Sequence, residues 1–346
     1  MTRPVPRDIS ALDDALSEPS DGLVQLFREL DGDLVILGAG GKMGPSLAMM
    51  ARRAMSLADG GERRSVVAVS RWSNEAVAHA LDAAGVIVKH ADLRHQSSVE
   101  SLPYARNVIF MAGQKFGSGG DPASTWMMNT VVPVWCGDRY AGARQVVFST
   151  GNVYPLSPAT GPGVNESTPP APVGEYAMSC LGRERVMTAL GDMLTSPVAL
   201  YRLNYACALT YGVLTDLAVK VRDGVPVDVT MGAVNVIWQR DANDIALRLL
   251  AHAATPAIAV NVTGIETLLV RTLATLLGER LGRTPVFTGI EAHDALLSDA
   301  RALASRFPDL TPMPLTQLLD WTADWVGAGR PLLGKATKFE VRDGRF

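Results

Sequence analysis

The sequence has little of what metal centres, disulfide scaffolds and membrane spans require. Only three cysteines and five histidines occur among its 346 residues. Cys136, Cys180 and Cys207 are odd in number and far apart, and no close metal-ligand spacing occurs, so we expect no metal site and a reduced, cytoplasmic protein. No apolar stretch is long enough to cross a bilayer, and residues 1–20 lack the apolar segment of a signal peptide.

The sequence also lacks an excess of charge of either sign. The formal net charge is -3, and charged residues make up 19% of the chain. Neither nucleic acid nor an anionic membrane surface is therefore expected as a partner. The apolar content of 47% is ordinary for a soluble protein, and a chain of this length can build one large domain or two smaller ones.

What the sequence does contain, near its start, is a strand, a glycine-rich turn and a helix in direct succession. The apolar run 33–37 predicts a strand, and residues 46–58, rich in Ala, Leu and Met, predict a helix. Glycines between them allow a tight turn and close approach of a ligand, and a helix start attracts an anion, so the segment predicts a site for a dinucleotide pyrophosphate. The expected cofactor contacts are Gly38, Gly40, Gly41, Lys42, Met43 and Gly44.

Strand and helix patterns then alternate along the chain. The expected strands are 65–69, 86–88, 107–111, 145–148 and 197–203, and the expected helices are 72–84, 125–140 (with a break near Pro133) and 174–194. This alternation predicts an α/β fold with a doubly wound, mainly parallel Rossmann sheet, in which ligands bind at the carboxyl ends of the strands.

The alternation becomes looser after residue 203, so we expect three parts: an N-terminal extension 1–31, a dinucleotide-binding Rossmann domain 32–203, and a smaller C-terminal α/β substrate-binding region 204–346. In the last part we expect strands at 225–229, 234–238 and 257–262 and helices at 241–252, 266–281, 291–306 and 315–326. Residues 1–20 are expected to be loose, 22–30 a short helix, 155–173 a loop, and 334–346 a polar tail.

The residues after the second and third strands bear on the choice of cofactor. An acidic residue after the second strand would bind the ribose 2′-hydroxyl of NAD, but this sequence has Ser70 and Arg71. A hydroxyl and a guanidinium suit a 2′-phosphate, so we expect NADP to be preferred, with NAD as the alternative. Asp92, followed by Leu93, is expected to accept a hydrogen bond from the adenine amino group.

Later motifs include the loop Ala112-Gly113-Gln114-Lys115, the segment Ser149-Thr150-Gly151-Asn152-Val153-Tyr154, and the helix start Tyr176-Ala177-Met178-Ser179-Cys180. Together with the glycine turn, these resemble the extended short-chain dehydrogenase/reductases, a family that includes NAD-dependent sugar epimerases and dehydratases. The resemblance extends over roughly residues 33–330.

The resemblance implies a role for particular residues. Tyr176 and Thr150 would be catalytic, with Ser149 as the second choice for the catalytic hydroxyl, and Lys115 would lie near the nicotinamide ribose. Asn129 would be structural. Ala112, Gly113, Lys115, Tyr176 and Cys180 would lie at the cofactor, and Ser149, Asn152, Arg202 and Asn204 would contact substrate. Helices 125–140 and 174–194 would pair two subunits in a homodimer.

At Cys180 the sequence departs from the family, which has a lysine there. An unperturbed tyrosine titrates near pH ~10, and the positive charge of the lysine normally lowers that value, which a cysteine does not do. Three interpretations follow: Lys115 or the oxidised nicotinamide supplies the charge, or catalysis is slow, or the fold binds cofactor without redox chemistry.

These observations predict an NAD(P)-dependent oxidoreductase that transfers hydride at a hydroxyl or ketone of a carbohydrate-like small molecule. Tyr176 would give the proton and Thr150 would polarise the carbonyl, with Lys115 as the replacement cation. The alternatives are an NAD(P)-dependent sugar epimerase or dehydratase, and a non-catalytic NADP(H)-binding sensor.

Overall fold

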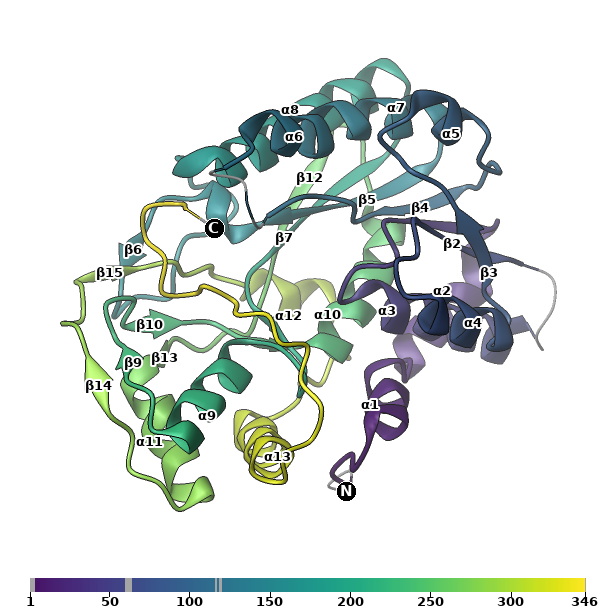
Figure 1. Cartoon of the computed structure of the whole chain (residues 1–346). Coiled ribbons are helices and arrows are strands. Elements are labelled where there is room, and N and C mark those ends of the chain that lie inside the picture. Colours follow the sequence, from purple (N-terminus) through teal and green to yellow (C-terminus); the bar gives the residue numbers. More distant parts are fainter. Residues whose placement is uncertain (1–3, 60–63, 116, 118–119, 346) are drawn as a thin grey trace.

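A seven-stranded sheet forms the centre of the molecule (Figure 1). The computed structural model describes residues 4–59, 64–115, 117 and 120–345. The strand order is β12-β7-β5-β4-β1-β2-β3, and every neighbouring pair is parallel, so the carboxyl ends of the strands meet at one edge. The predicted doubly wound α/β sheet is confirmed. Its strands are β1 Leu34–Leu37, β2 Val66–Ser70, β3 Ile87–His90, β4 Asn107–Phe110, β5 Arg144–Thr150, β7 Val198–Leu203 and β12 Ile258–Val262.

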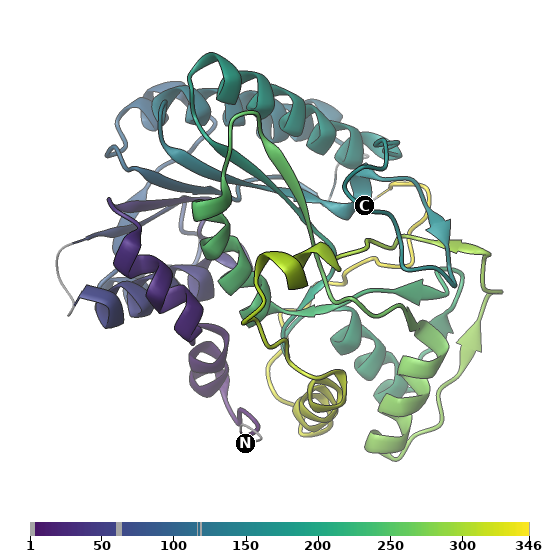
Figure 2. The same cartoon turned by 180° about the vertical axis from the view of Figure 1, so that it is seen from behind.

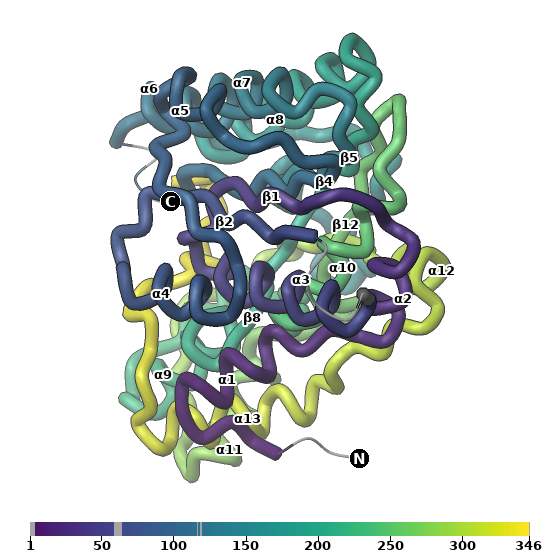
Figure 3. Tube along the Cα trace, turned by 90° about the vertical axis from the view of Figure 1, so that its right-hand side faces the viewer, coloured from purple at the N-terminus to yellow at the C-terminus, as the bar shows by residue number. Residues whose placement is uncertain are grey.

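Helices cover both faces of this sheet (Figures 2 and 3). One face carries α5 Gln96–Glu100, α6 Pro122–Trp126, a π-helical turn Met127–Val131, α7 Val132–Arg139 and α8 Gly174–Met193. The other carries α2 Asp21–Glu29, α3 Gly44–Asp59, α4 Glu75–Ala83 and α10 Gln239–Arg248. Successive side chains of a strand point to opposite faces, so Val35 and Leu37 pack in one core cluster while Leu34 and Ile36 pack in the other.

The sheet extends past residue 203, where the sequence placed the end of the first domain. The strand predicted at 257–262 forms β12, which pairs with β7 at the end of the sheet. The C-terminal region is built around a separate core, with α9 Val213–Asp223, α11 Val270–Leu281 and α13 Leu315–Gly327 packed on one another. Its short paired strands are β6 Ser157–Pro158, β8 Ala206–Cys207, β9 Val227–Asp228, β10 Ala233–Val234, β11 Ile237–Trp238, β13 Leu268–Leu269, β14 Phe287–Thr288 and β15 Asp294–Ala295, and the remaining short helices are η2 Gly151–Val153, η3 Leu249–His252 and α12 Ala302–Arg306.

The N-terminal segment differs from the loose extension that we expected over residues 1–20. α1, Ile9–Leu16, is capped by Asp8, whose carboxylate accepts a hydrogen bond from the Ala11 N–H at 2.8 Å. Leu12 and Leu16 are buried in the core of the C-terminal region. The segment is therefore part of the fold, because its apolar face closes that core.

The helix predicted over residues 291–306 is also wrong. Only α12, Ala302–Arg306, is helical, and β15, Asp294–Ala295, pairs in an antiparallel manner with β6. The N–H of Ser298 is bonded to the side chain of Asn235 at 2.9 Å. Long-range pairing thus outweighs the helix propensity of this alanine- and leucine-rich stretch.

The segment after α13 runs back across the molecule. We call residues 330–345 the C-terminal strap; it is the yellow segment in Figure 1. It passes from α13 to the start of α8, where Gly344 lies against Val173 and Gly174. The segment expected to be only a polar tail therefore spans the side of the molecule on which the strands end.

Candidate active site

The glycine turn lies between β1 and α3, as the sequence predicts. Gly38 has φ +90°, and a Cβ there would lie 2.6 Å from the backbone of Ala112. A Cβ on Gly44 would collide with the carbonyl of Ala39. Gly41 is different, because it is exposed and its Cβ would meet only the Gly38 carbonyl oxygen, at 3.5 Å. Two glycines are thus required by the packing of the turn, while the third leaves its outer side open to a ligand.

The remaining residues of the turn are placed differently. Gly40 is exposed and abuts the Ser70 side chain, and Met43 is half-buried against the main core. The Lys42 ammonium lies 3.2 Å from the centre of the Tyr211 ring. Desolvation there, with repulsion from Lys115, lowers the pKa of Lys42 to about 7.

The predicted adenosine-binding residues lie at the ends of β2 and β3. Ser70 is half-buried and Arg71 is exposed. Asp92 forms a 2.6 Å ion pair with Arg94, and hydrogen bonds from Arg94 lower the pKa of Asp92 to about 2. The Leu93 side chain is buried in the core on one face of the sheet.

Tyr176, Thr150 and Lys115, predicted from separate motifs, lie together. Tyr176 is on the first turn of α8, and Thr150 is the last residue of β5. The Lys115 ammonium lies 5.8 Å from the centre of the Tyr176 ring. Burial raises the pKa of Tyr176 above its usual range, while the charge of Arg183 and a hydrogen bond from Thr150 act to lower it.

The Thr150 hydroxyl has a fixed orientation. Its oxygen accepts hydrogen bonds from the backbone N–H of Asn152 at 3.1 Å and from the Asn152 amide at 2.9 Å. A hydroxyl has one proton and two lone pairs. The two Asn152 bonds therefore direct the single Thr150 proton toward the Tyr176 oxygen.

Cys180 and Arg183 follow Tyr176 on the same face of α8, at spacings of four and seven residues. Cys180 is 1% exposed, and burial raises the pKa of its thiol. The buried Arg183 guanidinium donates to the Phe148 carbonyl at 2.7 Å and to the carboxamide oxygen of Asn129 at 2.7 Å. The sequence interpretation did not assign Arg183 to the site, although its helical spacing from Tyr176 could have indicated it.

Asn129 ties the loop after β4 to α8. Its side chain accepts from the Gln114 N–H at 2.9 Å and donates to the Gln114 carbonyl at 3.0 Å and to Ser179 Oγ at 2.9 Å. Gly113, next to Gln114, has no room for a side chain, because a Cβ would lie 2.7 Å from Arg183. These contacts hold the loop that carries Lys115 beside the helix that carries Tyr176. Ala112 precedes this loop and is buried in the sheet core.

The expected substrate residues Ser149 and Arg202 lie in a buried network. Glu184 accepts hydrogen bonds from Ser149 Oγ at 2.5 Å and from Arg202 Nε and Nη2 at 2.9 and 2.6 Å. Arg202 also donates to the Tyr154 hydroxyl at 2.6 Å, and that hydroxyl donates to Asn261 at 2.9 Å. The Ser149 and Arg202 side chains are thus hydrogen-bonded within the protein, close to Thr150 in β5.

Asn204 was also expected to contact substrate, but its side chain is buried, with 2% exposed. Its amide donates to the Leu296 carbonyl at 3.4 Å, and its side chain packs beside Gly151. It joins the end of β7 to the β15 segment, next to the residue that follows Thr150.

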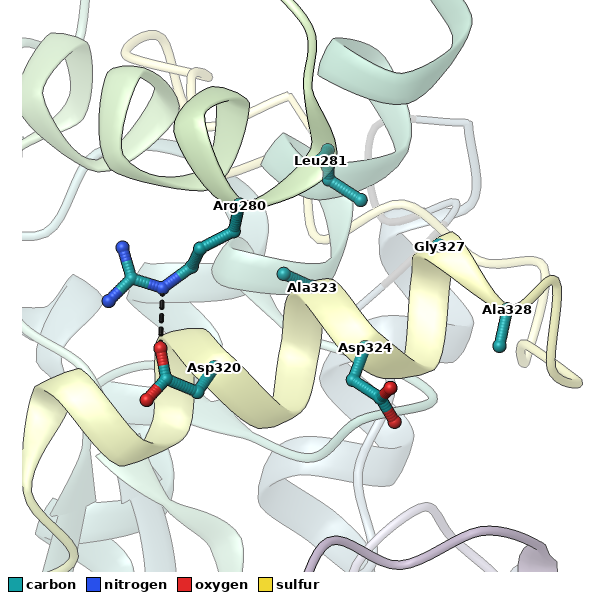
Figure 4. A pocket seen from close by; sticks show the side chains of 7 residues that line it. All are labelled: Arg280, Leu281, Asp320, Ala323, Asp324, Gly327 and Ala328. Carbon is teal, nitrogen blue, oxygen red and sulfur yellow. Dashed lines mark hydrogen bonds and ion pairs between the residues drawn. The ribbon is translucent and has the colours of Figure 1, made fainter.

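A pocket of about 450 Å³ lies elsewhere, between α11 and α13 (Figure 4). Arg280 and Asp320 at its edge form a 2.7 Å ion pair, and Asp324 pairs with Arg330 at 2.7 Å. The charged side chains that line this pocket are therefore already paired with one another or with Arg330. The group formed by Tyr176, Thr150 and Lys115 at the strand ends remains the candidate active site.

Among the residues that the structure describes, no group of three or more His, Cys, Asp or Glu side chains is arranged to hold a metal ion. Within the same residues, no helix has the length and apolar character needed to cross a membrane.

A scan against models of protein families gave no match, and a search of curated proteins gave none either. Solved structures do match. The UDP-glucose 4-epimerase of Thermus thermophilus, solved with NAD, has a TM-score of 0.67 and 20% identity over 84% of this chain and 98% of that chain. MoeE5, solved with UDP-glucose and NAD, has a TM-score of 0.67 and 19% identity over 86% and 99%. The UDP-Glc/GlcNAc 4-epimerase of Campylobacter jejuni has a TM-score of 0.67 and 19% identity over 85% and 98%. These similarities establish the shared fold.

Proposed function

We propose that the protein is an NAD(P)-dependent oxidoreductase that transfers hydride at a hydroxyl or ketone of a carbohydrate-like small molecule. The observation that carries this proposal is the grouping of Tyr176, Thr150 and Lys115 at the strand edge that also holds the glycine turn. β1, β4 and β5 are adjacent, so a dinucleotide with its pyrophosphate at the start of α3 extends naturally toward these three residues.

The residues of the turn fit such a cofactor. Gly38 and Gly44 have no room for side chains, and the exposed Gly41 leaves the turn open on its outer side. The backbone N–H groups at the start of α3 would hold the pyrophosphate. When bound, the nicotinamide would supply a hydride to a carbonyl carbon or take one from an alcohol carbon.

Tyr176 is suited to donate a proton to the carbonyl oxygen of a bound ketone. Burial raises the pKa of Tyr176, so the phenol stays protonated at neutral pH, which favours the reducing direction. The Thr150 proton, directed toward the Tyr176 oxygen by the two Asn152 bonds, would form a bifurcated hydrogen bond that also reaches the carbonyl oxygen of a substrate bound beside that tyrosine. Lys115 and Arg183 would stabilise the phenolate that remains after proton transfer.

NADP is our proposed preference over NAD. Arg71 is exposed beside the half-buried Ser70 at the end of β2, where a 2′-phosphate would lie. The structural neighbours from Thermus thermophilus and MoeE5 were solved with NAD, so NAD is the alternative. Fluorescence titration with NADPH and NADH tests this choice, and a clearly lower dissociation constant for NADH would reverse it.

A sugar epimerase is the second candidate function. It is favoured by the names of the neighbours, which include 4-epimerases of UDP-sugars. Stoichiometry separates the two: a ketone or sugar substrate that causes a net change in NAD(P)H marks a dehydrogenase, and turnover without net change marks an epimerase.

The main experiment measures dinucleotide binding and turnover on sugar ketones, sugar alcohols and UDP-sugars. For Tyr176→Phe we expect turnover to fall by about 100- to 10,000-fold, the usual contribution of a general acid, with the dissociation constant for dinucleotide unchanged within about twofold. Tyr104→Phe, at a half-exposed tyrosine on the protein surface, is the matched control. If wild-type protein binds no dinucleotide, the proposal fails; if it binds one tightly but turns over none of these compounds, the non-catalytic sensor is the better description.

We also infer a homodimer in the cytoplasm. Trp126, Val131 and Met178, on the α6–α8 layer, are 37–39% exposed, which would suit the subunit contact expected there. Cys136, Cys180 and Cys207 are free thiols, which is consistent with a reducing compartment. Sedimentation analysis tests the dimer.

A further inference from the structure

The C-terminal strap is anchored to the C-terminal region beside the strand-end site. The Leu333 N–H donates to the Thr210 carbonyl at 3.0 Å. The backbone N–H and the hydroxyl of Thr337 both donate to Asp216, at 2.7 and 2.6 Å. Phe339 is 1% exposed within the C-terminal core. These contacts fix the middle of the strap as part of the fold.

The far end of the strap is held as well. The Arg342 guanidinium forms an ion pair with Asp294 and donates to the carbonyl of the same residue at 2.8 Å. Gly344 then packs against Gly174, two residues before Tyr176. The strap therefore ends next to the start of α8, which carries the proposed proton donor (Figure 1).

This path brings two strap lysines toward two lysines of the Rossmann half. The Lys115 ammonium lies 3.5 Å from the Thr337 carbonyl, one residue before Lys338. Lys42 extends from the glycine turn to the Tyr211 ring, and the neighbouring Thr210 carbonyl is bonded to the strap. The strap backbone that carries Lys335 and Lys338 thus passes beside Lys115 and beside the loop that Lys42 contacts, at the edge where the strands end.

The charges in this group are mostly of one sign. Desolvation, with repulsion from Lys115 and Lys335, lowers the pKa of Lys42, and desolvation, with repulsion from Lys338, lowers the pKa of Lys115. Asp216 opposes this effect at Lys42, but its carboxylate also accepts both hydrogen bonds from Thr337. An anion bound among the four lysines would relieve the repulsion between them.

We propose that Lys335 and Lys338 of the strap complete, with Lys42 and Lys115, a binding site for a diphosphate group beside the glycine turn. A diphosphate carries several negative charges on a short chain of oxygens, so it can contact lysines from both the turn and the strap. The start of α3 adds its free N–H groups to the same side. The assignment of the diphosphate to the dinucleotide or to the substrate rests on the proposed function. The existence of the anion site does not depend on that function.

The experiment uses the full-length protein and inorganic pyrophosphate as the probe, measured by isothermal titration calorimetry. The test variant is Lys335→Gln with Lys338→Gln, which removes two charges and keeps the length of both side chains. Arg345→Gln is the matched control, because Arg345 is on the same strap and its side chain is 87% exposed. We expect the double variant to bind pyrophosphate at least about tenfold more weakly, since two charge-assisted hydrogen bonds are lost, and the control to stay within about twofold.

Two further arms identify the source of the diphosphate. If the double variant also binds NADH at least tenfold more weakly, the group is the cofactor pyrophosphate. If NADH binding is unchanged while pyrophosphate binds the NADH-saturated variant more weakly than the NADH-saturated wild type, the group belongs to the substrate. The proposal is overturned if wild-type protein does not bind pyrophosphate or if the double variant binds it as the wild type does. Failure to bind NADH with intact pyrophosphate binding would instead refute the proposed function alone.

Discussion

Replacing Glu184 by glutamine removes the negative charge that pairs with Arg202 beneath the proposed catalytic residues. The two side chains are 3% and 7% exposed and joined at 2.6 Å, and the carboxylate also accepts a 2.5 Å bond from Ser149. Hydrogen bonding and charge from Glu184 raise the pKa of Arg202, even though burial acts in the opposite direction. Arg202 is therefore charged in the folded protein, and Glu184→Gln leaves it buried without its counter-ion.

Breaking one partner of a buried ion pair destabilises a protein by about 3–5 kcal/mol, because the remaining charge is no longer compensated. We expect Glu184→Gln to lower the free energy of unfolding by about 3 kcal/mol, the low end of that range, because the amide oxygen still accepts one hydrogen bond. Urea unfolding followed by tryptophan fluorescence measures the change. Glu291→Gln is the matched control: its carboxylate pairs with Arg271 at 2.7 Å, but the side chains are 41% and 47% exposed. An exposed pair of this kind contributes about 0–1 kcal/mol.

If Glu184→Gln is no more destabilising than Glu291→Gln, the buried pair does not hold the ends of β5 and β7 in place. The position of Thr150 at the end of β5 would then need another explanation.

Three other outcomes follow from the site. Gly44→Ala places a Cβ against the Ala39 carbonyl, so we expect at least about a tenfold loss of dinucleotide affinity in a fluorescence titration, and unchanged affinity would contradict the packing argument. The pKa is lowered to about 7 for Lys42 and to about 8 for Lys115, and only the protonated forms attract an anion. NADH affinity should therefore be highest near pH 6 and fall as the pH rises through 7 and 8, and a flat calorimetric profile would refute this. Cys180→Lys adds a cation at a position where the charges of Arg183 and Lys115 already act to lower the pKa of the thiol. We therefore expect turnover at pH 7 not to rise. A tenfold increase in the steady-state rate would show that the wild-type site lacks a cation.

The local patterns in the sequence were sufficient to predict the sheet and the glycine turn. Short apolar runs bounded by turn residues identify β1, β2, β4, β5 and β7, because a parallel strand is buried on both faces. The turn was recognisable because Gly38 and Gly44 serve packing needs that only glycine meets. Even α1 carries a readable signal, the capping residue Asp8, although where the helix packs is set by the distant core of the C-terminal region.

The parts of the site that the sequence did not predict depend on contacts between distant segments. Glu184 joins Ser149 to Arg202, and nothing near Glu184 in the sequence marks it as their partner. Most of the strap contacts join residues more than a hundred positions apart, as in the Thr337–Asp216 bonds. Motif spacing places side chains on the same element, but it does not reveal which loops a polar tail will cross.

The surroundings of Tyr176 explain how the proposed chemistry tolerates a cysteine at position 180. Pro133 has no N–H with which to bond the Asn129 carbonyl four residues earlier, and Arg183 Nε donates to that carbonyl at 3.1 Å instead. The fixed guanidinium opposes, but does not cancel, the burial that raises the pKa of Tyr176. A tyrosine of raised pKa is a poor base but remains a proton donor at neutral pH, so reduction makes less demand on a nearby cation than oxidation does. Positive charge is needed mainly once the phenolate has formed. Under our proposal, Lys115 and Arg183 provide that charge in place of a lysine at position 180.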